Sequence, residues 1–244
     1  MKGVILAAGT ASRLRPLTDH MHKCLLKLGD QTILKRTVNN LLKSGIDEIV
    51  IVTGYLAEQI KSFLSESFPS LNVHYINNDL YDSTNNIYSL WLTKEHIIHD
   101  DIILLDSDIV FDRRIIDLLL VSEHENCLAL RTSKVLGAEE MKVRLDDSGL
   151  IKDISKEIDT NLAAGESIGI EKFSSVFLDY LFQILDRRIL IDNAVDDFYE
   201  VAFQEAIDND KKVFAIDVAD YRCIEIDVIE DIEIAESQVI PYID

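Results

Sequence analysis

The sequence predicts an α/β fold, in which a mostly parallel sheet lies between two layers of helices. Apolar, β-branched runs alternate with segments of helical period through the first half of the 244 residues. Such alternation implies parallel strands whose crossover helices cover both faces of the sheet. The composition agrees, because 48% hydrophobic residues provide material for a sizeable core.

The expected elements of the first half follow one another with short connections. They are strand 3–7, helix 33–42, strand 48–52, helix 58–64, strand 73–76, helix 87–91 and strand 102–105. Gly45 follows the first helix as a stop signal, and Gly54 ends a strand at the edge where open α/β sheets bind ligands. We therefore expect residues 1–126 to form a Rossmann-like, nucleotide-binding half of an α/β/α sandwich.

The pattern changes to shorter strands after residue 126. The expected elements are strands 128–131, 142–145 and 150–154, helices 174–185 and 197–207, strands 213–216 and 223–226, and a last helix at 229–236. Residues 146–149 form a hairpin-type turn. Because no repeat or flexible linker separates the halves, we expect one domain over 1–244, with a small β-rich subdomain in 127–244.

The charge and the cysteines narrow the functional class. With 24 basic and 44 acidic residues, a net charge of −20 would repel a nucleic-acid backbone, so nucleic-acid binding is not expected. Cys24, Cys127 and Cys223 are far apart and without metal-binding spacing, which indicates reduced thiols of a cytoplasmic protein. No run of about 18 uncharged apolar residues predicts membrane insertion. A homo-oligomer remains an open alternative to a monomer.

The segment 6–18 is the most informative part of the chain. It reads Leu-Ala-Ala-Gly-Thr-Ala-Ser-Arg-Leu-Arg-Pro-Leu-Thr and follows a short apolar run. Backbone N–H groups of the small-residue turn can surround a phosphate, and the guanidinium groups of Arg13 and Arg15 can neutralise it. The segment therefore predicts a loop that binds a triphosphate.

Two acidic pairs are placed for a divalent cation. Asp106 and Asp108 follow the apolar run 102–105, so both project from one face at the carboxyl edge of the sheet. Glu225 and Asp227 repeat this spacing at the end of a late strand. Mg²⁺ accepts one or two carboxylates together with phosphate oxygens. The alternatives are a solvated loop for the first pair and, for Asp227, an N-cap of the last helix.

The segment 6–18 resembles the signature LAAGxGxRLxPLT of nucleotidyltransferases that join an NTP to a sugar phosphate or a phosphorylated alcohol. Lys23 stands in the place of the lysine in their downstream P-K-x-L stretch. Two residues depart from the pattern: Ala11 replaces the usual second glycine, and His22 replaces the usual proline.

A second segment, 83–90, resembles particular members of this group of enzymes. It is similar to the N-N-I-Y-S segment of bacterial phosphocholine cytidylyltransferases and of 2-aminoethylphosphonate cytidylyltransferases. Its amides and hydroxyls can hydrogen-bond a pyrimidine edge. The structural alternative is that Ser83 or Thr84 caps a helix while Tyr88 and Trp91 fill the core.

The resemblance implies a complete set of site residues. Arg13, Lys23 and Lys156 would act on the phosphates, with Lys156 on the acceptor side. The expected nucleotide-binding residues are Leu6, Ala8, Gly9, Thr10, Ala11, Ser83, Asn85, Asn86 and Asp106. The expected acceptor-binding residues are Glu166, Asp197, Tyr199 and Glu200, from the half 127–244. The expected ligands of Mg²⁺ are Asp108 and Asp227, with Glu225 beside them.

Residues 196–200 also have a pattern of their own. Their carboxylates and one aromatic ring are spaced for one helix face and could surround an ammonium group. A solvated helix face is the alternative.

These residues predict a Mg²⁺-dependent cytidylyltransferase that transfers CMP from CTP to phosphocholine and releases pyrophosphate. The alternatives are CTP-dependent activation of 2-aminoethylphosphonate, a sugar or inositol phosphate as acceptor, and a non-catalytic nucleotide-binding module. The chain shows no Ser/His/Asp or Cys/His pattern for covalent catalysis, and an anionic acceptor needs none.

Overall fold

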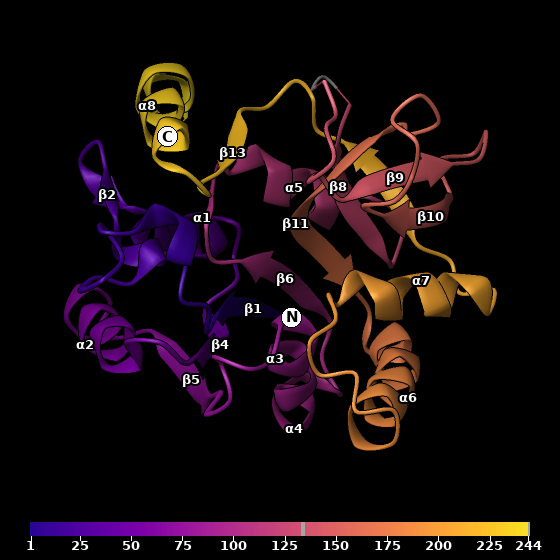
Figure 1. Ribbon diagram of the computed structural model, residues 1–244, viewed down its shortest axis with the longest axis horizontal. Coiled ribbons are helices and arrows are strands. Elements are labelled where there is room, and N and C mark those ends of the chain that lie inside the picture. Colours follow the sequence, from indigo (N-terminus) through magenta and orange to yellow (C-terminus); the bar gives the residue numbers. More distant parts are fainter. Residues whose placement is uncertain (133–134, 244) are drawn as a thin grey trace.

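The computed structural model describes residues 1–132 and 135–243, and its centre is one mixed sheet (Figure 1). The strand order is β10-β9-β11-β6-β1-β4-β5, with β8 paired to β11 and β12 paired to β8. The strands are β1 (Lys2–Ala7), β4 (Glu48–Thr53), β5 (Asn72–Asn77), β6 (Ile102–Asp106), β8 (Cys127–Arg131), β9 (Lys142–Leu145), β10 (Ile151–Ser155), β11 (Gly165–Phe173) and β12 (Phe214–Asp217).

The nucleotide-binding half that we expected is the parallel part of this sheet. Strand β1 pairs in parallel with β4 and β6, and β4 pairs in parallel with β5. In the central register Val4 lies beside Val50 and Leu104, and all three are fully buried. Strands covered on both faces need apolar residues at every position, which explains the continuous apolar runs in the sequence.

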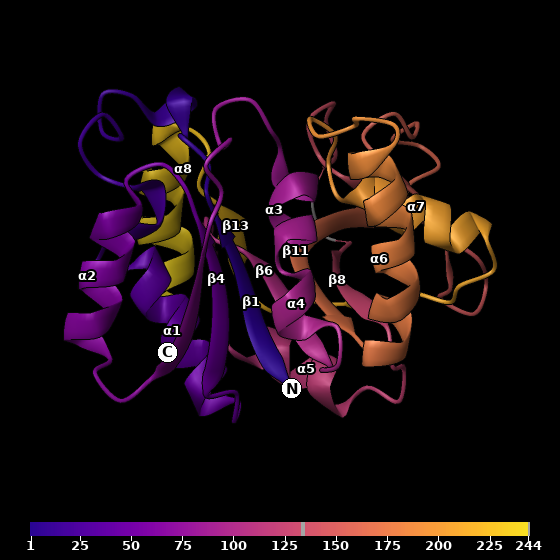
Figure 2. The ribbon, with the colours of Figure 1, turned by 90° about the horizontal axis from the view of Figure 1, so that it is seen from below.

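Helices cover both faces of the sheet, as Figure 2 shows. On one face α1 (Ile33–Lys43), α2 (Ala57–Ser67) and α5 (Arg114–Val121) pack on the odd-numbered side chains of β1, such as Ile5. On the other, α3 (Asn86–Leu92), α4 (Lys94–Ile97), α6 (Ser175–Leu190) and α7 (Glu200–Asp208) pack on Val4 and Leu6. The two apolar clusters are the two sides of an α/β/α sandwich.

The β-rich part is built around β11. This strand pairs antiparallel with β6, β8 and β9, so it joins the antiparallel strands to the parallel ones in one continuous sheet. A separate ribbon pairs β7 (Ile109–Phe111) with β13 (Cys223–Glu225), and a short hairpin pairs β2 (Lys27–Leu28) with β3 (Gln31–Thr32). The ribbon places Glu225 opposite Ile109 and therefore next to Asp108.

The C-terminal segment packs against residues of the N-terminal segment. Helix α8 (Ile229–Ile234) continues as a π-helical turn, and Ala235 and Val239 of this segment pack with Leu14 and Leu26 in a third apolar cluster. Figure 1 shows α8 beside the indigo N-terminal segments. This contact holds the residues after β13 against the loop after β1.

The predicted fold class is confirmed, but some elements were not predicted and one helix begins later than expected. The long strand β11 was missed because two glycines and several charges interrupt its apolar pattern. Helix α5 was also missed. The helix expected at 197–207 begins at Glu200, so residues 196–199 lie in a turn rather than on a helix face.

Within 1–132 and 135–243, no helix is both long enough and apolar enough to cross a membrane.

Candidate active site

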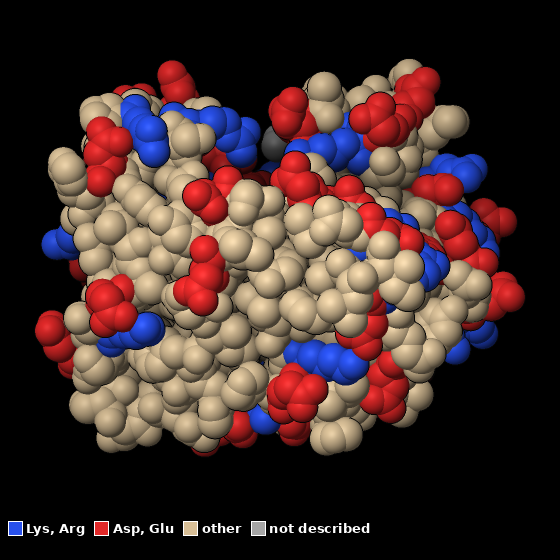
Figure 3. Space-filling model, turned by 60° about the horizontal axis from the view of Figure 1, so that its bottom comes forward, with Lys and Arg blue, Asp and Glu red and all other residues tan. Residues whose placement is uncertain are grey.

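A cavity of about 1150 Å³ opens at the carboxyl ends of β1 and β6. The molecule is hollowed at the top of the view in Figure 3, with acidic and basic side chains on both sides of the hollow. The predicted site residues that line the cavity are Leu6, Ala8, Gly9, Thr10, Ala11, Arg13, Lys23, Asn85, Asn86, Asp106, Asp108, Lys156, Glu166, Glu200, Glu225 and Asp227. Ser83, Asp197 and Tyr199 are not part of this lining.

The loop after β1 forms one wall of the cavity. A Cβ atom on Gly9 would meet nothing within 4 Å, so the missing side chain leaves open space over the loop backbone. Ala11 has φ 48° and ψ 50°, the left-handed conformation that glycine adopts without strain. The Ala11 carbonyl accepts hydrogen bonds from the Leu14 N–H (3.1 Å) and the Thr18 hydroxyl (2.9 Å). The conformation thus explains why the resembled pattern has glycine here.

Lys23 joins three distant segments of the chain. Its ammonium group donates to Oδ2 of Asp108 and to Oδ1 of Asp227, at 2.8 Å each, while Arg13 donates to Oδ2 of Asp227 at 2.7 Å. Burial opposes the charge of Lys23, but the two carboxylates raise its pKa. The two cations lower the pKa of Asp227 against the effect of its burial. Lys23 and Asp227 are therefore both charged at neutral pH.

His22 positions Lys23, a role that sequence reasoning missed. Its Nδ1 accepts the backbone N–H of Cys24 at 3.2 Å and so caps the turn Lys23–Leu25. Burial lowers the pKa of His22 to about 4, which keeps the ring neutral and Nδ1 able to accept.

Three carboxylates lie close enough to hold one metal ion. Ligand atoms of Asp108, Glu225 and Asp227 all lie within 4.8 Å of one another. Oδ1 of Asp108 is buried and finds no hydrogen-bond partner among the described residues. Burial and the charges of Asp108 and Asp227 raise the pKa of Glu225 to about 8. Such crowded oxygen ligands favour a hard cation.

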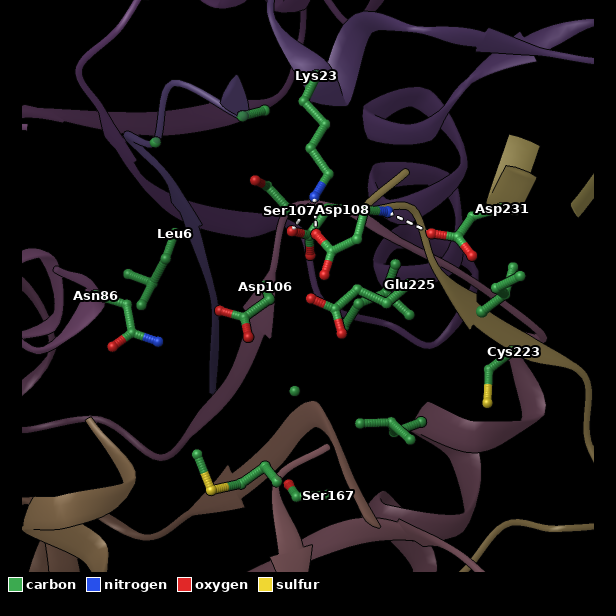
Figure 4. A pocket seen from close by; sticks show the side chains of 18 of the residues that line it. Leu6, Lys23, Asn86, Asp106, Ser107, Asp108, Ser167, Cys223, Glu225 and Asp231 are labelled. Carbon is green, nitrogen blue, oxygen red and sulfur yellow. Dashed lines mark hydrogen bonds and ion pairs between the residues drawn. The ribbon is translucent and has the colours of Figure 1, made fainter. Parts of the chain in front are cut away.

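Figure 4 shows how the side chains converge, with Lys23 reaching Asp108 from above and the carboxylates of Asp106 and Glu225 below.

Asp231, which we did not predict, holds the backbone of Asp227 in place. Its Oδ2 accepts the backbone N–H groups of Asp227 and Val228, at 2.8 Å each. Asp227 therefore precedes the last helix with its side chain turned to Lys23 and Arg13, and Asp231 provides the hydrogen bonds at that helix start.

Asp106 occupies a narrow space between β6, β11 and Tyr199. The Tyr199 hydroxyl donates to its Oδ2 at 3.0 Å, and a Cβ on Gly169 would come within 2.6 Å of the same oxygen. Burial raises the pKa of Asp106, and the charges of Asp108 and Glu200 raise it further. Gly169, at φ 69°, is required both by its conformation and by this contact.

In the segment 83–90, some side chains stabilise the local backbone and others line the cavity. The cap of α3 is Asn85, whose Oδ1 accepts the Asn86 N–H at 2.8 Å, rather than Ser83 or Thr84. Asn86 accepts the Tyr199 N–H at 2.8 Å and also lines the cavity. Ser83 instead bonds to the Leu80 carbonyl, at 3.3 Å.

The expected acceptor-binding residues separate into two groups. Glu200 and Glu166 line the cavity, although Glu166 is already bound by the Arg131 guanidinium, whose Nε lies 2.6 Å from its Oε1. Tyr199 is fully buried and packs on Phe203, and Asp197 faces Arg188 at 3.4 Å. The expected ammonium-binding face of residues 196–200 is therefore corrected: the Tyr199 ring has no face open to a ligand.

Comparison with known proteins agrees with this geometry. The family model described as nucleotidyl transferase matches residues 2–134. The chain is 28% identical to the CTP:phosphoglutamine cytidylyltransferase of Campylobacter jejuni, over 96% of this chain and 98% of the relative. It is 37% identical to a choline-phosphate cytidylyltransferase of Streptococcus pneumoniae, over 44% of this chain and 45% of the relative.

A solved structure of the CTP:phosphocholine cytidylyltransferase from Streptococcus pneumoniae superposes with a TM-score of 0.80 and 24% identity. The match covers 96% of this chain and 97% of that one. The likeness in structure shows a shared fold, and the family model covers more than half of the sequence. The chain therefore belongs to the nucleotidyl transferase family, whose members are enzymes.

Proposed function

We propose that the protein transfers the CMP group of CTP to phosphocholine or another small phosphorylated amine and releases pyrophosphate. Three similar proteins support this proposal by name: the phosphoglutamine, choline-phosphate and 2-aminoethylphosphonate cytidylyltransferases. The cavity supports it as well, since most of the residues that we expect to bind the phosphates, the base and the acceptor line one space.

The observation that carries the proposal is the position of Lys23 between Asp108 and Asp227, with Arg13 on the same aspartate. Two fixed cations thus lie beside a glycine-containing loop with open space above it. Fixed charges of this kind stabilise the negative charge that develops in phosphoryl transfer.

In the proposed step, an oxygen of the acceptor's phosphate attacks the α-phosphorus of CTP in line. The new P–O bond forms as the bond to the bridging oxygen of the β-phosphate breaks, and pyrophosphate leaves with that electron pair. Arg13 and Lys23 offset the charge on the leaving group, and Lys156 holds the acceptor's phosphate. Positioning and electrostatics supply the rate enhancement, with no covalent enzyme intermediate.

The residues present fit a Mg²⁺ ion. Asp108 and Asp227, with Glu225 beside them, would hold it, because their oxygens lie within 4.8 Å and one buried oxygen of Asp108 has no partner in the described chain. Bound there, the ion would supply charge neutralisation at the phosphates.

The test is pyrophosphate release from CTP, UTP, GTP and dTTP, each with phosphocholine, phosphoethanolamine, 2-aminoethylphosphonate and a sugar 1-phosphate. We expect turnover with CTP and a phosphorylated or phosphonylated amine, and a CMP adduct by mass spectrometry. Turnover confined to the sugar phosphate, or CTP binding without turnover of any pair, would overturn the proposal.

A further inference from the structure

Glu200 presents a buried carboxylate to the cavity. Its residue is 7% exposed and lines the cavity wall, at the first turn of α7. Its Oε2 is buried and has no hydrogen-bond partner in residues 1–132 and 135–243. A buried carboxylate oxygen without a donor is costly, so a ligand that supplies one would be bound strongly here.

A second buried carboxyl group, that of Glu171, lies within reach of the charge of Glu200. Glu171 on β11 is fully buried, and neither of its oxygens has a hydrogen-bond partner in the described structure. Burial raises the pKa of Glu171, and the charge of Glu200 raises it further. This wall of the cavity therefore favours a cation.

Lys156 provides the opposite charge nearby. It acts on Glu200 electrostatically, yet its ammonium group lies 4.4 Å over the Phe198 ring and 3.9 Å from Glu139 rather than in an ion pair with Glu200. A positive and a negative group side by side, and not paired with each other, match a zwitterion that carries a phosphate and an ammonium group.

Two aromatic rings that line the cavity, those of Phe198 and Tyr221, already have a cation over one face. Lys156 covers Phe198, and the Arg114 guanidinium lies 4.8 Å over Tyr221. A trimethylammonium group binds chiefly to open aromatic faces, whereas a primary ammonium donates hydrogen bonds to carboxylates.

We propose that Glu200, with the buried Glu171 nearby, selects an acceptor that ends in a primary ammonium group over one that ends in a quaternary ammonium. This inference rests on the proposed function and adds to it the chemistry of the acceptor's cationic end.

The test is kcat/KM with CTP for phosphoethanolamine, its N-methyl and N,N-dimethyl derivatives, and phosphocholine. We expect kcat/KM to fall by about tenfold or more along the series, because each methyl group removes a donor and adds bulk.

Glu200→Gln should raise the KM for phosphoethanolamine about tenfold and leave the KM for CTP unchanged. It should also make kcat/KM nearly equal for the four compounds. Glu200→Asp should keep the order. Asp208→Asn, an exposed carboxylate change on the same helix, is the control and should leave the series as it is.

A series that rises toward phosphocholine, or one that Glu200→Gln leaves intact, would overturn the inference. Calorimetric binding of the same four compounds separates it from the proposed function. Binding in the expected order without any CMP transfer would contradict the proposed function alone, whereas transfer with the reverse order would contradict this inference alone.

Discussion

The Tyr199 hydroxyl donates a 3.0 Å hydrogen bond to Oδ2 of Asp106, which links the residue before α7 to the carboxyl end of β6. Tyr199 is fully buried, and its backbone N–H is bound by Asn86. One side chain therefore fixes a cavity carboxylate, and its backbone holds the amide of a second cavity residue. Tyr199 acts by positioning these groups, not by offering its ring to a ligand.

Replacing Tyr199 by Phe should remove this one hydrogen bond and keep the ring packing on Phe203. We expect the free energy of unfolding to fall by about 1 kcal/mol, and kcat to fall with the KM for the acceptor little changed. Urea unfolding and steady-state kinetics measure the two effects. A selective rise in the acceptor KM would instead mean that Tyr199 contacts the acceptor.

Two glycines of the cavity should respond differently to alanine. Gly9→Ala meets no protein atom within 4 Å, so the variant should unfold at the wild-type temperature and yet use CTP poorly, because its methyl group fills ligand space. Gly169→Ala should lose stability by about 1 kcal/mol or more, since it combines φ 69° with a 2.6 Å approach to Asp106. Gly149→Ala, at φ 82° in open space, measures the conformational part alone. Equal loss of stability at Gly9 would show that this glycine is structural.

The three-carboxylate cluster should bind a divalent cation. Asp108→Asn and Asp227→Asn should each lower kcat by about a hundredfold or more and weaken Mn²⁺ binding in a titration followed by electron paramagnetic resonance. Circular dichroism checks that both variants fold. Normal Mn²⁺ affinity in either variant would remove that residue from the cation site.

Local patterns in the sequence predicted the parts of the site that lie within one segment. The loop 6–18 and the pairs Asp106/Asp108 and Glu225/Asp227 each begin at the end of a strand, so strand ends alone indicate where they meet. The effect of Glu200 on Glu171 was not predictable, because it requires β11, whose glycines and charges hide the strand. Tyr199 was misplaced for a related reason: helix α7 begins one residue after it, and no local signal marks that start.

The buried glutamates should make stability depend on pH in a defined window. Burial raises the pKa of Glu200 to about 7, whereas an unfolded glutamate has its pKa at 4.5, so the folded state binds this proton more tightly. The stabilisation from this group is complete below pH 4.5 and is lost as the pH rises through 7. Because the two pKa values differ by about 2.5 units, the free energy of unfolding falls by at most about 3 kcal/mol.

Lys156 is the charged side chain that acts on the titration of Glu200, and it lowers the pKa of that carboxyl. Glu200 in turn raises the pKa values of Asp106 and Glu171. Between pH 8 and pH 5 the free energy of unfolding should therefore rise more in the wild type than in Glu200→Gln. The variant lacks this rise because its amide cannot be protonated. Urea unfolding at pH 5, 6, 7 and 8 gives the difference between the two proteins. Asp208→Asn, whose carboxylate is exposed, should follow the wild type. If Glu200→Gln and the wild type changed in parallel, the pKa of Glu200 would not be raised on folding, which would contradict the prediction.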